Sequence, residues 1–304
     1  MNNPLSLSST LNADYIPATS QPRLIYAMLS VQVDALPSTP VPVTLDLVVD
    51  ASNSMKIPLI TDEQFQELAS LGAVREVIQD GIPVWHFDFV PRGFAEQCPK
   101  PLDIVKIALL AGIQALRTDD RCGLVAFAGN ARRLSPVMPA SRSKDLLKAV
   151  DKLEAIDLGN DTRLASGLSL SVKELMHKER FPRNSVRRIV MLTDGFAKDE
   201  QEALRWGQQA AQAGISISTM GLGAEFNEEL LLTLADTSGG NAYFFEDLSQ
   251  ILDAFAKELG AAQSVALRDL EIKLKLYGGV ELRRAYRVKP HHQQAHFGHF
   301  GKRI

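Results

Sequence analysis

Long apolar runs and compositional extremes are both missing from this 304-residue chain. No stretch approaches the roughly 18–20 apolar residues that a membrane-spanning helix needs, so we expect no membrane segment. The net charge of −3 gives no electrostatic reason to expect nucleic acid or an anionic membrane as a partner. Two cysteines are too few for a disulfide framework. The opening residues also lack a signal-peptide pattern, and together these absences predict a cytoplasmic protein.

From residue 43 to about residue 265, strand-like apolar runs alternate with helical segments. Continuous apolar strands between helices indicate a mostly parallel sheet that is covered on both faces. Pro136 interrupts one of these runs, which suits an edge strand. The expected strands are 43–50, 121–129, 132–140, 187–195, 215–223 and 241–247, and the expected helices are 103–117, 143–156, 163–176, 200–214, 227–236 and 249–265.

The segments on either side of this region do not follow the alternation. Residues 1–20 are predicted to be a flexible N-terminus, and residues 291–304 a disordered tail. Residues 21–42 and 266–290 are predicted to form a small antiparallel, sandwich-like β-module. In this module strand 22–33 would pair with a hairpin that turns at Gly278-Gly279.

An insertion, residues 57–100, follows the first strand of the main domain. Thr61 and Gln64 have the spacing of a capping box, which predicts a helix. Asp80-Gly81 is a turn signal between two strand-like runs, which predicts a β-hairpin. Trp85 and Phe87 in this hairpin either form a contact surface or pack on the main domain, and we favour packing.

Side chains that carry oxygen gather where apolar strands end. Asp50-Ala51-Ser52-Asn53-Ser54 follows strand 43–50 directly, and Thr193-Asp194-Gly195 ends strand 187–195. In open α/β sheets, ligand sites lie at these carboxyl ends. Asn160-Asp161-Thr162 comes just before a helix. Hydroxyl and carboxylate oxygens suit a hard cation such as Mg²⁺.

The three motifs, in this order and context, resemble the von Willebrand factor A (VWA) family over about residues 43–265. The resemblance implies a Rossmann-like, doubly wound α/β domain with a six-stranded sheet in the order 3-2-1-4-5-6. It also implies a metal-ion-dependent adhesion site. There, Ser52 and Ser54 would ligate Mg²⁺ directly, with Mn²⁺ or Ca²⁺ as alternatives, and Thr162 would do so in the ligand-bound state. Asp50 and Asp194 would act largely through water, with Asp194 as a direct ligand in the unliganded state. The insertion departs from the family's short connection and leaves the shape of the site's rim open.

This resemblance implies a non-enzymatic protein-binding module in which a partner's Asp or Glu completes the coordination of the cation. By analogy with intracellular relatives, we expect an adaptor in a multiprotein assembly, with AAA+ ATPases as one class of associate. Neither nucleic acid nor a membrane is expected as a partner.

Other interpretations of the same residues are open. A metal-dependent phosphohydrolase would use Asp50 as a nucleophile, but its pattern has a second Asp where this chain has Ser52. A metal could also serve only to stabilise the fold. The tail residues His291, His292, His296 and His299 could bind a transition metal, although a mobile tail is the favoured interpretation.

Overall fold

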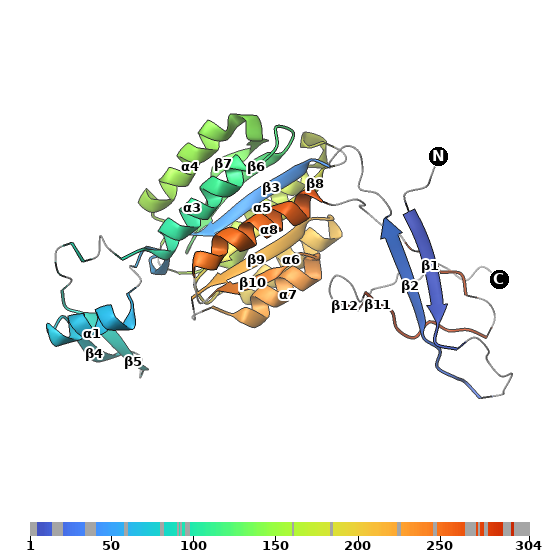
Figure 1. Cartoon of the computed structure of the whole chain (residues 1–304), viewed down its shortest axis with the longest axis horizontal. Helices are drawn as coiled ribbons and strands as arrows, with labels where there is room; N and C mark the ends of the chain where they lie inside the picture. The colour runs from blue at the N-terminus through green and yellow to red at the C-terminus, as the bar shows by residue number, and fades with distance from the viewer. Residues whose placement is uncertain are drawn as a thin grey trace.

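A computed structural model shows a central α/β domain with a smaller unit on each side of it (Figure 1). The structure describes residues 5–13, 21–33, 41–57, 60–79, 82–89, 91, 93–94, 98–159, 161–182, 185–223, 226–245, 248–264, 272, 274–276, 279–287 and 293–294. Within these residues, no helix is long and apolar enough to cross a membrane.

The central sheet has six strands in the order β10-β9-β8-β3-β6-β7. Five of them are parallel, and β7 pairs antiparallel with β6 at one edge. Every residue of β3 and β8 is buried, which explains why the runs are mostly apolar. The predicted six-stranded, doubly wound sheet and its order are therefore confirmed. The strands are β3 (Val43–Asp50), β6 (Arg121–Phe127), β7 (Ala131–Pro139), β8 (Val186–Thr193), β9 (Ser216–Leu222) and β10 (Ala242–Phe245).

Helices cover both faces of the sheet and bury two separate apolar clusters (Figure 1). One cluster lies beneath α3 (Pro101–Gln114), α4 (Ser143–Ala155) and α8 (Ile251–Gln263). The other lies beneath α5 (Leu164–Met176), α6 (Glu200–Gln212) and α7 (Glu228–Ser238). Short 3-10 helices occupy Ser54–Lys56 (η1), Ala140–Arg142 (η2), Lys178–Arg180 (η3) and Leu248–Gln250 (η4).

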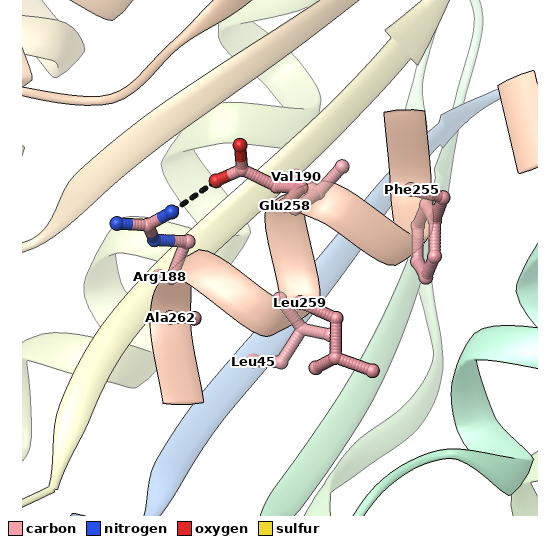
Figure 2. Close-up of a pocket in the computed structure, with 7 residues that line it drawn as sticks. All are labelled: Leu45, Arg188, Val190, Phe255, Glu258, Leu259 and Ala262. Atoms are coloured by element: carbon pink, nitrogen blue, oxygen red, sulfur yellow. Dashed lines mark hydrogen bonds and ion pairs between the residues drawn. The ribbon is translucent and has the colours of Figure 1, made fainter. Parts of the chain in front are cut away.

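A buried carboxylate on α8 binds this last helix to the sheet. Figure 2 shows Glu258 reaching Arg188 of β8, while Phe255 and Leu259 of the same helix lie close by. The Glu258 side chain is 1% exposed. It also accepts hydrogen bonds from Ser218 Oγ at 2.5 Å and Tyr243 Oη at 2.9 Å. Glu258 therefore connects α8 to β8, β9 and β10.

The insertion contains the helix and the hairpin that were predicted: α1 (Asp62–Ser70), β4 (Val74–Gln79) and β5 (Ile82–Phe87). The capping box of Thr61 and Gln64 is confirmed, whereas the Asp80-Gly81 turn lies outside the described residues. Trp85 packs edge to face on Phe65 of α1, with ring centroids 5.0 Å apart, and stays 55% exposed. Its ring contact is thus made within the insertion itself.

The N-terminal region differs from its prediction. Residues Leu5–Leu11 form β1, which pairs antiparallel with β2 (Ala27–Val33), so the expectation of a flexible segment is wrong for this stretch. The sequence of β1 is LSLSSTL, in which the alternation of leucine and serine ends after four residues. The register sets Leu7 opposite Val31, so the strand is stabilised by its pairing with β2.

The predicted pairing of strand 22–33 with a C-terminal hairpin is replaced, within the described residues, by the β1–β2 pair. Gly278 and much of the proposed hairpin lie outside the described residues. Near the C-terminus, β11 (Tyr286–Arg287) pairs with β12 (Gln293–Gln294), so part of the predicted disordered tail is a short strand. The histidines of the tail also lie outside the described residues.

Candidate metal-binding site

Two of the sequence motifs lie side by side because their strands are neighbours. β3 and β8 are paired in parallel, with Val49 opposite Leu192. The carboxyl ends of parallel neighbours reach the same edge of a sheet. The loop that begins at Ala51 and the loop that begins at Asp194 therefore start from adjacent points.

Asp50 is the buried carboxylate of this site, with 0% exposure. Its Oδ1 accepts a hydrogen bond from the backbone N of Ser52 at 2.9 Å, and its Oδ2 accepts one from Oγ1 of Thr193 at 2.6 Å. Burial raises the pKa of Asp50 above its ordinary value, although the bonds from Thr193 and Ser52 act in the opposite direction. Among the described residues, no basic side chain forms an ion pair with it, so a nearby cation would offset the cost of its charge.

A chain of hydroxyl contacts joins the first loop to the second. Oγ of Ser52 lies 2.9 Å from Oγ of Ser54, and Oγ of Ser54 donates to Oδ1 of Asp194 at 2.8 Å. Two hydroxyls and a carboxylate, separated by up to 142 positions in the chain, thus meet at one point.

Thr162 brings the third loop to the same place. A Cβ atom built on Gly195 would lie only 2.8 Å from Oγ1 of Thr162, so the threonine packs directly against the residue after Asp194. The backbone N of Lys198 donates to the carbonyl O of Thr162 at 2.9 Å, which fixes the two loops together. Asn160 lies outside the described residues.

Asp161, the neighbour of Thr162, has a separate contact. Its Oδ1 accepts from Nζ of Lys198 at 2.6 Å, and this hydrogen bond lowers the pKa of Asp161. Because both side chains are largely exposed, the pair is a surface contact that holds the loop. The prediction left Asp161 out of the ligand set, and this contact gives it another role.

Three further residues support the site and were not among the predicted ligands. Thr193 holds Asp50, Gly195 makes room for Thr162, and Asp199 accepts from the backbone N of Ala165 at 3.1 Å, at the start of α5. Thr193 and Gly195 belong to the Thr-Asp-Gly motif, which was a usable signal. Asp199 had no signal of its own, because its bond partner lies 34 positions away.

The chemistry of these donors fits a hard divalent cation. Serine and threonine hydroxyls together with carboxylates are ligands that Mg²⁺ accepts in an octahedral, partly hydrated shell. Within the described part of the chain, no group of three or more His, Cys, Asp or Glu forms an alternative metal site. A cation here would depend on the hydroxyls of Ser52, Ser54 and Thr162, which disfavours a soft metal.

Comparison with known proteins supports the same picture of the fold. A family model for the von Willebrand factor type A domain matches residues 99–257, which include Thr162 and Asp194. The match begins at residue 99, at the end of the insertion, so it excludes the Asp50–Ser54 loop.

Two bacterial proteins that are longer than this chain resemble it in sequence. The chain is 27% identical over 179 residues to the uncharacterized protein sll0103 of Synechocystis sp., covering 58% of this chain and 41% of that protein. It is 23% identical over 179 residues to the uncharacterized protein YfbK of Escherichia coli, covering 57% of this chain and 30% of that protein. The aligned region thus spans less than half the length of these curated relatives.

Solved structures share the fold at low sequence identity. A von Willebrand factor type A protein from Catenulispora acidiphila superposes with a TM-score of 0.58 at 13% identity, covering 84% of this chain and 50% of that one. The ArnB paralog VWA2 from Sulfolobus acidocaldarius gives a TM-score of 0.52 at 17% identity, covering 84% of this chain and 54% of that one.

Proposed function

Because this chain belongs to the von Willebrand factor type A domain family, we propose that it binds a divalent cation and uses it to hold an acidic side chain of a protein partner. Domains of this family are in general protein-interaction modules without enzymatic activity, and many carry a metal site. The proposed ligands are Asp50, Ser52, Ser54, Thr162 and Asp194. The contact chain from Ser52 through Ser54 to Asp194 is the observation that carries this proposal.

The donor set explains how such a cation would act. Ser52, Ser54 and Thr162 would supply neutral hydroxyl oxygens, while Asp50 and Asp194 act largely through water. Carboxylates outside the inner shell leave the cation electrophilic, so a partner's Asp or Glu can fill a vacant position. The rim carries Ile57 and Phe196, which are 58% and 61% exposed. A partner with apolar residues beside its acidic one would match this rim.

The finer parts of the proposal follow from the same chemistry. Mg²⁺ is the expected cation, with Mn²⁺ or Ca²⁺ as alternatives. A cytoplasmic adaptor role in a multiprotein assembly, with AAA+ ATPases as one class of associate, rests on the family analogy.

A direct test compares the wild type with Asp50→Ala. Isothermal titration calorimetry with Mg²⁺ should give a binding isotherm for the wild type and none for the variant. A pull-down from native lysate should capture a partner with Mg²⁺ but not with EDTA, and the variant should capture it in neither. Asp253→Ala, which removes an exposed carboxylate on α8, is the matched control. Full Mg²⁺-dependent capture by a folded Asp50→Ala protein would refute the proposal.

Two alternatives give different outcomes in these assays. A phosphohydrolase would turn over phosphoester substrates with Mg²⁺, but both carboxylate oxygens of Asp50 already accept hydrogen bonds in a fully buried position, which does not suit a nucleophile. If the metal served only to stabilise the fold, its removal by a chelator would lower the melting temperature of the protein and leave partner capture unchanged.

A further inference from the structure

A cationic recess lies at the sheet edge beside the candidate metal site. It has a volume of about 310 Å³ and lies between the first residues of β7 and the last turn of α4. We propose that this recess binds a second carboxylate of the same partner, so that the protein recognises a segment with two acidic residues. The inference rests on the proposed function, which supplies the site for the first carboxylate. The recess is lined by Arg132, Arg133, Leu134, Lys152, Ala155 and Ile156.

Two of the positive charges in the recess are available to a ligand. Arg132 and Lys152 are exposed, and within the described part of the chain neither side chain makes an ion pair or a hydrogen bond. Arg133 differs, because its guanidinium is engaged by both carboxylate oxygens of buried Asp46, at 3.0 and 2.8 Å. The neighbouring Glu154 is paired with Lys100 and Lys106. Arg132 and Lys152 therefore form an uncompensated cationic pair that suits an anionic group.

The strand register places this recess beside the metal loop. Arg132 lies opposite Ala126 of β6, and the next residue of β6, Phe127, lies opposite Asp50. Two strand spacings thus separate Arg132 from β3, roughly 10 Å at the usual spacing between neighbouring strands.

A direct contact also joins the two places. Lys56, two residues after Ser54, donates from Nζ to the carbonyl O of Ile156 at 2.7 Å, and Ile156 lines the recess. The wall of the recess and the metal loop are therefore held in one arrangement.

This separation defines the ligand. A peptide in the polyproline II conformation has three residues per turn and advances about 3.1 Å per residue, so residues i and i+3 lie on one face about 9 Å apart. Acidic residues at positions i and i+3 of a segment in this conformation would reach the cation and the recess together. The apolar parts of Leu134 and Ile156 offer a wall for side-chain methylenes, which favours glutamate over aspartate at the second position.

The test uses two labelled synthetic peptides, Gly-Gly-Glu-Gly-Gly-Glu-Gly-Gly and the same peptide with the second Glu replaced by Gln. Their affinities for the full chain are measured by fluorescence anisotropy at low salt, with Mg²⁺ and with EDTA. With Mg²⁺, the wild type should bind the diacidic peptide about tenfold more tightly, about 1.4 kcal/mol. In the double variant Arg132→Glu/Lys152→Glu the preference for the diacidic peptide should be lost or reversed, because carboxylates replace both cations. Lys148→Glu/Arg205→Glu changes the net charge equally at exposed sites outside the recess, and should preserve the tenfold difference.

Each outcome bears on one proposal or on both. Equal binding of the two peptides by the wild type, or a preference for the diacidic peptide that survives Arg132→Glu/Lys152→Glu, overturns the recess and leaves the metal site standing. Binding of the diacidic peptide that is unaffected by EDTA but is lost in Arg132→Glu/Lys152→Glu supports the recess and refutes the metal-dependent function. No binding of either peptide under any condition overturns both.

Discussion

Replacing Gly195 changes the geometry of the site without removing any of its proposed ligands. An added Cβ would lie 2.8 Å from Oγ1 of Thr162, so Gly195→Ala must displace that hydroxyl. We expect Mg²⁺ affinity to fall about tenfold, equivalent to about 1.4 kcal/mol, while all five proposed ligands remain in the sequence. Titration calorimetry with Mg²⁺ measures this change. Gly260→Ala, on a helix where nothing lies within 4 Å of the added atom, should leave the affinity unaltered.

Side chains differ in how far the sequence alone could identify them. The predicted ligands carried signals, because hydroxyls and carboxylates stood directly after apolar strands or before a helix. The ion pair of Asp46 with Arg133 could not be found in this way. The two residues are 87 positions apart and meet only because β7 folds back beside β6, one strand away from β3. A long-range polar pair has no local pattern, so the sequence does not reveal it.

The attachment of α8 to the sheet depends on one buried side chain, Glu258. Glu258 forms an ion pair with Arg188, whose side chain is only 10% exposed. Burial alone would raise the pKa of Glu258, but Arg188 and the hydrogen bonds from Ser218, Asn241 and Tyr243 outweigh it, so the pKa is lowered. Glu258→Gln leaves Arg188 without its counter-charge, and we expect the free energy of unfolding at pH 7 to fall by about 3 kcal/mol.

The pH dependence gives this prediction a second test. A carboxylate with a lowered folded-state pKa stabilises the fold above its unfolded pKa of about 4.3, and the stabilisation is lost as the pH falls through the folded value. Urea unfolding from pH 7 down to about pH 3.5 should therefore show that the wild type loses more stability on acidification than Glu258→Gln. Glu154→Gln, in an exposed pair, should cost under about 1 kcal/mol. Parallel acid profiles for the wild type and Glu258→Gln would contradict the assigned role.

Most strands and helices could be predicted because their patterns are long and repetitive. All six strands of the central sheet and its six flanking helices appear near their expected places. The ends of some helices and strands differ from the predicted ends, because individual residues near them determine where the element begins or stops. For example, α3 begins at Pro101, two residues early, because proline fits the first turn of a helix. β1 escaped prediction because a seven-residue Leu/Ser stretch is stabilised by its pairing with β2 and not by its own composition.

For the whole chain, the distribution of buried residues indicates which part of the protein can fold independently of the rest. Both apolar clusters consist of residues between Val43 and Ala262, and neither includes any residue between Met55 and Leu102. The insertion buries its own Leu68 and Ala73 outside these clusters. Figure 1 shows it on the opposite side of the α/β domain from β1 and β2. The central domain therefore has a complete core without either flanking unit.

Replacing residues 58–97 with a short Gly/Ser linker tests this independence. Because no core contact is removed, we expect the free energy of unfolding to stay within about 1 kcal/mol of the wild-type value. The urea m-value should decrease, since less surface is exposed on unfolding. Mg²⁺ affinity should be retained, because the Asp50–Ser54 loop and η1 precede the deletion. Urea unfolding and Mg²⁺ calorimetry measure both quantities. A linker variant that unfolds without cooperativity would show that the insertion is part of the core, whereas a cooperatively folded variant that no longer binds Mg²⁺ would show that the insertion positions the metal loop.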